Sequence, residues 1–122
     1  MEKFSQKEIE SAANDHQVDD IGFRDGDIRR SIDIDKINKA AQWISTNMVK
    51  VSAINRRNSS YGLKHVCEKD IGYVSNGEFI IAAILLGYKY KRCASNSQNC
   101  WFKMGAGAIN NARKRQEKEA KR

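Results

Sequence analysis

The sequence contains no proline among its 122 residues, so the strongest helix breaker is absent and long helices are favoured. It also lacks a long apolar run, since the longest, residues 79–86, falls far short of the ~20 residues that span a bilayer. Residues 1–4 are not followed by the apolar stretch of a signal peptide. With 40% apolar and 30% charged residues, the composition predicts one soluble globular domain.

Cysteine and histidine are scarce, which limits redox, metal and catalytic chemistry. The three cysteines are an odd number without the spacing of a secreted scaffold, so we expect reduced thiols and a cytoplasmic location. Cys93 and Cys100 flank a predicted loop, where a disulfide or a metal site is conceivable. With His65 and Cys67 they form a formal set of four zinc ligands, but no C-x₂-C or H-x₃-H pair supports such a site.

Catalytic signals are also missing. Neither His16 nor His65 is accompanied by a nucleophile at a recognisable spacing, although His65 can pair with Glu68 within one helix. A phosphate-binding glycine loop is absent as well. We therefore predict a protein that is not an enzyme, with no catalytic residues, no cofactor and no metal.

The net charge of +7 is unevenly distributed along the chain. Residues 1–35 contain 5 Lys and Arg against 10 Asp and Glu, a net −5. Residues 36–122 contain 17 against 5, a net +12. Such polarisation steers a polyanion toward the basic part, with strong salt dependence. The alternative is a solvated surface that only keeps the protein soluble.

Apolar periodicity and capping signals predict four helices, over residues 6–14, 34–56, 60–71 and 76–87. Ser5 and Ser75 are each followed three residues later by glutamate, which is typical of a capping box. The longest predicted helix has an apolar stripe made up of Ile37, Ala40, Ala41, Ile44, Met48 and Val51. The last is apolar nearly all round, which places it in the centre of the fold.

Residues 88–91 alternate in the manner of a strand, and residues 100–104 are rich in strand formers, which predicts a β-hairpin. Gly105 and Gly107 predict a flexible joint, followed by a polar tail without an apolar stripe to hold it down. We expect a mainly α-helical fold with a small β-hairpin. Its three parts are an acidic segment (1–35), a helical core with the hairpin (36–104) and a basic tail (105–122).

The 60–71 helix, the 76–87 helix and the hairpin loosely resemble a helix-turn-helix with a wing. In that motif the second helix reads bases, but here it offers only Asn76 and Glu78 near its start. We therefore expect contacts to the backbone of a nucleic acid rather than to base edges. The candidate phosphate ligands are Arg56, Arg57, Lys64, Lys89, Lys91, Arg92, Lys103, Arg113, Lys114 and Arg115.

Aromatic residues lie among these charges. Tyr61, Tyr90 and Trp101 are candidates for stacking on unpaired bases. Alternatively, they close the core beneath the hairpin, since large aromatics are more often buried. The basic tail suits non-specific phosphate contacts, or is a solvated extension.

Residues 54–81 contain the segments SSYGLKH (59–65) and GYVSNGEFI (72–80). This region resembles small proteins of bacterial plasmids, prophages and integrated mobile elements, a group without an established activity. The resemblance implies a bacterial mobile element as the setting. Basic proteins in that setting regulate or package nucleic acid, and others inhibit host defence complexes such as CRISPR or restriction systems.

These observations lead to one main expectation and two alternatives. We expect a small, non-enzymatic nucleic-acid-binding protein of the bacterial cytoplasm, with no membrane partner. The first alternative is an inhibitor of a host defence complex, which uses the acidic 1–35 segment as a nucleic-acid mimic or the basic face against an acidic protein. The second is an oligomerising structural protein.

Overall fold

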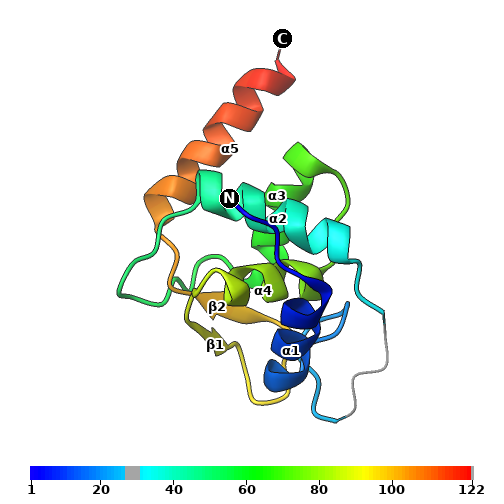
Figure 1. The fold of residues 1–122 in the computed structure, drawn as a ribbon. Coiled ribbons are helices and arrows are strands. Elements are labelled where there is room, and N and C mark those ends of the chain that lie inside the picture. Colours follow the sequence, from blue (N-terminus) through cyan, green and yellow to red (C-terminus); the bar gives the residue numbers. More distant parts are fainter. Residues whose placement is uncertain (27–30, 122) are drawn as a thin grey trace.

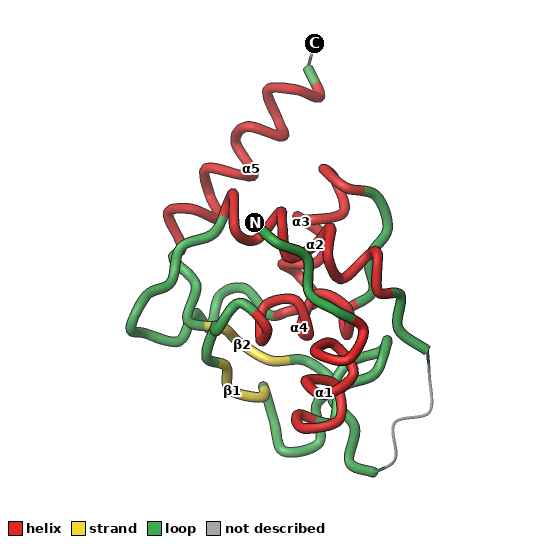
Figure 2. Tube along the Cα trace, in the orientation of Figure 1, coloured by secondary structure: helices red, strands yellow, loops and turns green. Residues whose placement is uncertain are grey.

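The computed structural model describes residues 1–26 and 31–121, and confirms a mainly helical fold with a small antiparallel hairpin (Figure 1). Its elements are α1 (Gln6–His16), α2 (Ile34–Asn47), α3 (Ser60–Ile71), α4 (Asn76–Leu85), β1 (Tyr90–Arg92), β2 (Cys100–Phe102) and α5 (Ala106–Ala120). Figure 2 shows α4 in the middle, between α2 on one side and the hairpin on the other, with α5 projecting away from the body. No helix in the described ranges is long and apolar enough to cross a bilayer.

Helix α4 forms the centre of the hydrophobic core, as its sequence predicts. Residues 76–83 are all buried, and Phe79, Ile80 and Ile81 are completely inaccessible to solvent. The helix packs against α1, α2 and α3, and its side chains join one core cluster with residues of β2 and α5. Burial of each large apolar side chain contributes about 1.5–3 kcal/mol relative to its exposure.

Both predicted capping boxes are present, at Ser5 before α1 and at Ser75 before α4. The second contains a buried carboxylate, because Glu78 is only 4% exposed. Its Oε1 accepts a hydrogen bond from the Ser75 amide (2.9 Å), and its Oε2 accepts one from the Asp33 amide (2.8 Å). Asp33 is the N-cap of α2, so one side chain joins the starts of α2 and α4.

The prediction of a helix over 34–56 is wrong in its second half, because α2 ends at Asn47. Met48 has extended backbone angles, and residues 49–55 run beside β2 and the residues that follow it. Three backbone hydrogen bonds join these segments, from Gly105 N to Val49 O (2.9 Å), Val51 N to Lys103 O (3.1 Å) and Asn55 N to Phe102 O (3.0 Å). The open edge of β2 supplies partners that a helix would not use, and the β-branched valines favour extended backbone.

The prediction of a tail with no apolar stripe is also wrong. Residues 106–120 form α5, and Ile109, Ala112 and Gln116 are buried along one side of it. Gln116 Nε2 donates a hydrogen bond to the Val66 carbonyl of α3 (2.8 Å). This stripe combines a large, a small and a polar side chain, so hydrophobicity alone does not reveal it. The last turn of α5 projects beyond the body (Figure 1).

The acidic segment contributes to the core instead of lying wholly outside it. Val18 and Phe23 are buried and form an isolated β-bridge with each other. The loop between them packs tightly on the start of α4, where a Cβ atom on Gly77 would lie 1.5 Å from the Asp19 carbonyl oxygen. Residues 27–30 of this segment lie outside the described residues.

Candidate nucleic-acid interface

The pairing of the hairpin determines which side chains face solvent. Tyr90 lies opposite Phe102, and Lys91 lies opposite Trp101. Phe102 is completely buried, so its neighbours in sequence point to the other face, because successive side chains alternate along a strand. Lys103 N donates to the Lys89 carbonyl (3.0 Å), which continues the pairing beyond the strand ends. The outer face of the hairpin therefore presents three lysines and a tryptophan.

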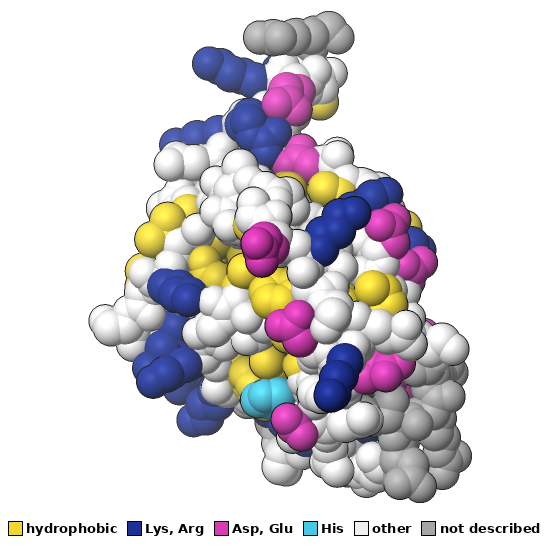
Figure 3. Space-filling model, viewed as in Figure 1, with side chains coloured by type: hydrophobic (Ala, Val, Ile, Leu, Met, Phe, Trp, Pro, Cys, Tyr) yellow, Lys and Arg dark blue, Asp and Glu magenta, His cyan; other side chains and the backbone are white. Residues whose placement is uncertain are grey.

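The 49–59 segment adds further cations beside this face. The Arg56 guanidinium carbon lies 4.8 Å from the centroid of the Trp101 ring, and the neighbouring Arg57 is exposed. Lys50 forms an isolated bridge with Met104. We call the resulting surface the basic hairpin face, and its residues are Lys50, Arg56, Arg57, Lys89, Lys91, Trp101 and Lys103. Figure 3 shows Lys and Arg side chains gathered along the left edge of the molecule, over the hairpin and this segment.

The cations of the basic hairpin face form no ion pair with any carboxylate in the described part of the chain. Between residues 36 and 116 the only acidic residues are Glu68, Asp70 and Glu78, and each is engaged in internal contacts. Within the described part of the chain, no carboxylate lies within 4.0 Å of a cation of this face. Six positive side chains therefore lie together without the ion pairs that neutralise cations elsewhere in the protein.

Lys64, a predicted phosphate ligand, is not available at the surface. It is only 6% exposed, and its Nζ lies 2.5 Å from Glu68 Oε1. The same ammonium group lies over the rings of Tyr61 and Tyr73, 5.4 Å and 4.9 Å from their centroids. Lys64 therefore acts as an internal cation that positions two aromatic rings.

Arg92 is also largely occupied by internal contacts. Its Nη1 forms an ion pair with Asp25 (2.7 Å), and its Nε donates to the Ser97 carbonyl (2.9 Å). The Asp25 contact ties the acidic segment to the edge of the hairpin.

Of the predicted stacking residues, Tyr90 belongs to the core. Its ring packs against Phe23 and Phe102, with centroids 4.9 Å and 6.4 Å away, and its hydroxyl lies 2.8 Å from His16 Nδ1. Burial raises the pKa of the Tyr90 hydroxyl, so the group remains protonated at neutral pH. Tyr61 is instead 51% exposed, and Trp101 is half-buried beneath Arg56.

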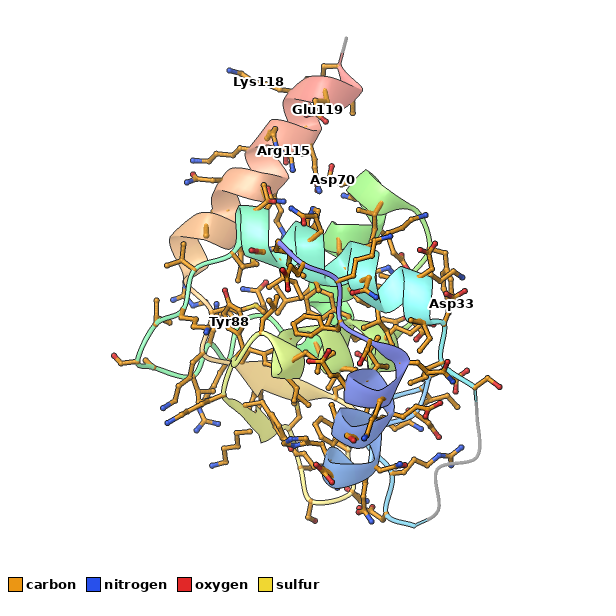
Figure 4. All side chains as sticks on the ribbon, viewed as in Figure 1. Asp33, Asp70, Tyr88, Arg115, Lys118 and Glu119 are labelled. Carbon is orange, nitrogen blue, oxygen red and sulfur yellow. The ribbon has the colours of Figure 1, made fainter. Side chains whose placement is uncertain are left out.

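The predicted basic residues of the tail divide into two kinds. Lys114 is exposed and Arg113 is half-buried, whereas Arg115 forms ion pairs with Asp70 (2.6 Å) and Glu119 (3.0 Å). Figure 4 shows Asp70 facing Arg115 across the space between α3 and α5. Arg115 therefore anchors α5 to the body.

The anchor has a clear electrostatic signature at Asp70. The hydrogen bonds from Arg115 lower the pKa of the Asp70 carboxyl to about 2, despite its partial burial. The bonds from Trp43 Nε1 (2.6 Å) and Gln116 Nε2 (3.1 Å) act in the same direction. Three helices, α2, α3 and α5, thus meet at one carboxylate.

The cysteines and histidines do not assemble a metal site. The described residues contain no group of three or more His, Cys, Asp or Glu side chains that could hold a metal ion. All three thiols are free, and burial raises the pKa of Cys67 to about 12. Cys93 N donates to the Asn99 carbonyl (3.0 Å), and His65 Nδ1 bonds to Glu68, as its spacing predicts (3.1 Å).

The sequence reasoning missed two residues of interest, Lys50 and Tyr73. Lys50 was assigned to the interior of a helix, where nothing marked it as a neighbour of the hairpin. Tyr73 follows the glycine that ends α3 and is 64% exposed, and no local sequence pattern marked it as part of a site. The α3–turn–α4 unit offers no base-reading helix, because α4 is buried from Asn76 to Ala83.

Comparison of the chain with protein-family models, curated proteins and solved structures finds no match. The resemblance to proteins of mobile elements therefore stays a prediction.

Proposed function

We propose that this protein is a non-enzymatic nucleic-acid-binding protein that holds the phosphate backbone on its basic hairpin face. The observation that carries the proposal is a cluster of six cations, none of which is paired with a carboxylate of the described residues. Like charges held together at a surface repel one another, and a polyanion relieves that repulsion while releasing its own counterions. Because α4 is buried, the contacts fall on phosphates and sugars rather than on base edges.

The arrangement of the cations suits an extended polyanion. The residues come from three adjacent backbone segments, β1, β2 and residues 49–59, which are joined by hydrogen bonds and therefore keep their relative positions. Arg56 and Arg57 provide guanidinium groups, which bind phosphate oxygens in a bidentate manner. Lys114 extends positive charge along α5.

The test is a fluorescence anisotropy titration with labelled single-stranded and duplex oligonucleotides at several salt concentrations. The test variant is Arg57→Ala combined with Lys91→Ala, which removes two exposed cations of the face. The matched control is Lys39→Ala combined with Lys69→Ala, which removes the same charge from exposed positions on α2 and α3. Circular dichroism establishes that both variants keep the fold.

We expect the test variant to weaken binding and to reduce the slope of log K against log salt by about 1 to 2, because two phosphate contacts are lost. The control variant should lose less affinity, since it changes only the net charge. Equal losses in the two double variants would mean that binding follows total charge and not this face. Absence of binding by the wild-type protein at low salt would refute the proposed function.

The structure gives less support to inhibition by nucleic-acid mimicry. In the acidic segment, Glu8 and Asp33 cap helices, and Asp19, Asp25 and Asp35 form ion pairs. A mimic needs carboxylates that are free to replace phosphates, and five of those in this segment already have partners. Inhibition through the basic hairpin face remains the alternative if nucleic acid does not bind.

A further inference from the structure

A polar cleft of about 610 Å³ lies where the starts of α3 and α4 approach the loop of the hairpin. Tyr61 and Tyr73 form its aromatic sides. Its polar lining includes Asp20, Asn76 and Asn99. The combination of flat aromatic surfaces with amide and carboxylate groups is typical of a site for a planar, hydrogen-bonding ligand.

The two tyrosines are exposed but held in place. Tyr61 is 51% exposed and Tyr73 is 64% exposed, which is unusual for large aromatic residues. Both rings contact the ammonium group of Lys64, which is itself buried, and Lys36 Nζ also lies over the Tyr73 ring, 4.9 Å from its centroid. The ion pair of Lys64 with Glu68 fixes this cation, so the rings keep their positions when no ligand is present. Pre-positioned aromatic faces lower the entropic cost of stacking.

The polar lining of the cleft is fixed by internal hydrogen bonds. Asn76 is 7% exposed, and its Nδ2 donates to the Ile21 carbonyl and to Asn99 Oδ1, both at 2.9 Å. These bonds fix the orientation of the amide. The Oδ1 atoms of Asn76 and Asp20 have no hydrogen-bond partner among the described residues. Both atoms have almost no accessible surface, so they are not exposed to the cleft, and a buried water can satisfy them.

The cleft lies next to the basic hairpin face. The backbone of Ser59 forms an isolated antiparallel β-bridge with that of Trp101, and Ser60 Oγ accepts a hydrogen bond from the Cys100 amide (3.1 Å). Tyr61 follows directly, so its Cα lies no more than ~7 Å along the chain from that of Ser59. A strand whose phosphates occupy the face can therefore place a base in the cleft.

We propose that the cleft between Tyr61 and Tyr73 binds one unpaired nucleobase of a single strand whose backbone lies on the basic hairpin face. This inference rests on the proposed function and narrows its ligand to single-stranded nucleic acid. The base stacks on the tyrosine rings. Stacking on an aromatic ring is tolerant of base identity, so the cleft accepts any unpaired base.

The experiment measures binding of oligodeoxycytidine, oligothymidine and a duplex by fluorescence anisotropy. The test variants are Tyr61→Leu and Tyr73→Leu, at exposed positions where loss of the ring does not disturb the core. We expect each to weaken binding of oligodeoxycytidine about tenfold and to leave duplex binding unchanged, because only an unpaired base can enter the cleft. Tyr→Phe at the same positions restores the ring and should recover most of the lost affinity. The wild-type protein should bind both oligodeoxycytidine and oligothymidine more tightly than the duplex, because only the single strands offer an unpaired base.

A second measurement separates this inference from the proposed function. Cytidine monophosphate is titrated into the labelled protein, and the amide NMR signals of Asn76 and Asn99 are followed. If single strands bind and neither the Leu variants nor the nucleotide has an effect, the cleft proposal fails and the proposed function stands. If the nucleotide shifts these signals but Arg57 and Lys91 prove irrelevant to oligonucleotide binding, the proposed function fails alone. No binding in either assay refutes both.

Discussion

The contact between Asp70 and Arg115 should make a measurable, pH-dependent contribution to stability, and Asp70→Asn removes it with little change in shape. The folded-state pKa of about 2 lies below the value of ~3.9 for an unperturbed aspartate. Each unit of difference corresponds to about 1.4 kcal/mol. Arg115 is 40% exposed, so solvent screening reduces the effect. We expect the substitution to lower the free energy of unfolding by about 1 to 2 kcal/mol at neutral pH.

The pH dependence gives the sharper test. Because the folded pKa is depressed, the contribution is fully present above about pH 5 and is lost as the pH falls toward 2. The wild-type and Asp70→Asn proteins should therefore differ less in stability at low pH. Urea unfolding followed by circular dichroism measures this difference. In a Trp101→Phe background, fluorescence reports on Trp43, whose Nε1 bonds to Asp70 (2.6 Å).

Asp35→Asn provides the matched control, because its ion pair with Lys39 is exposed on both sides. Such pairs contribute about 0–1 kcal/mol, so this substitution should change stability little at any pH. The reasoning would be refuted by a difference between wild type and Asp70→Asn that stays constant from pH 7 to pH 3. A comparable cost for Asp35→Asn would refute it too.

Three further predictions concern packing and thiol chemistry. Gly77→Ala should lower the free energy of unfolding by about 3 kcal/mol or more, because the added Cβ would collide with backbone atoms of the acidic loop. The control is Gly62→Ala, whose Cβ would have no neighbour closer than 3.9 Å, so this substitution should be neutral or stabilising. Ile109→Ala should cost about 2–5 kcal/mol in urea unfolding, since this side chain is completely buried between α5 and the body; a cost below 1 kcal/mol would show that α5 is not docked. Cys93 should react with iodoacetamide before Cys67, which is buried with a raised pKa, and mass spectrometry of the modified peptides would reveal the reverse order.

Elements with local signals could be predicted from the sequence. The capping boxes at Ser5 and Ser75 correctly mark the starts of α1 and α4, and Gly72 ends α3 with a positive φ of 85°. These signals depend on residues within three or four positions of each other. The central position of α4 also follows from its own sequence, because a helix with no polar face has to be buried.

The wrong predictions concern segments whose structure depends on contacts with residues far away in the sequence. Residues 49–55 leave the helix because β2, some fifty positions later, offers a free edge for hydrogen bonds, and no local sequence pattern indicates this. The apolar stripe of the predicted helix ended with Val51, which is 40% exposed in the structure. The docking of α5 likewise depends on the Val66 carbonyl and the Asp70 carboxylate, which have no counterpart in the tail itself.

The candidate site shows the same division. Lys89, Lys91 and Lys103 were predicted as phosphate ligands on a β-hairpin, whereas Trp101 was left open between stacking on bases and closing the core. The ion pair of Lys64 with Glu68 was visible as an i,i+4 spacing, but its burial was not. Arg92 pairs with Asp25 across 67 positions, a contact that becomes apparent only in the folded chain.

The buried Glu78 carboxylate has a consequence for the order of folding. Its bond to Ser75 spans three residues and can form on the timescale of a helix, whereas its bond to Asp33 closes a loop of 45 residues. Helix α4 can therefore begin with its own cap, and α2 docks afterwards on a carboxylate that is already in place. We expect the start of α4 to form early in folding and the first turn of α2 to dock on it late. The Glu78 carboxylate would then influence the order in which the core assembles.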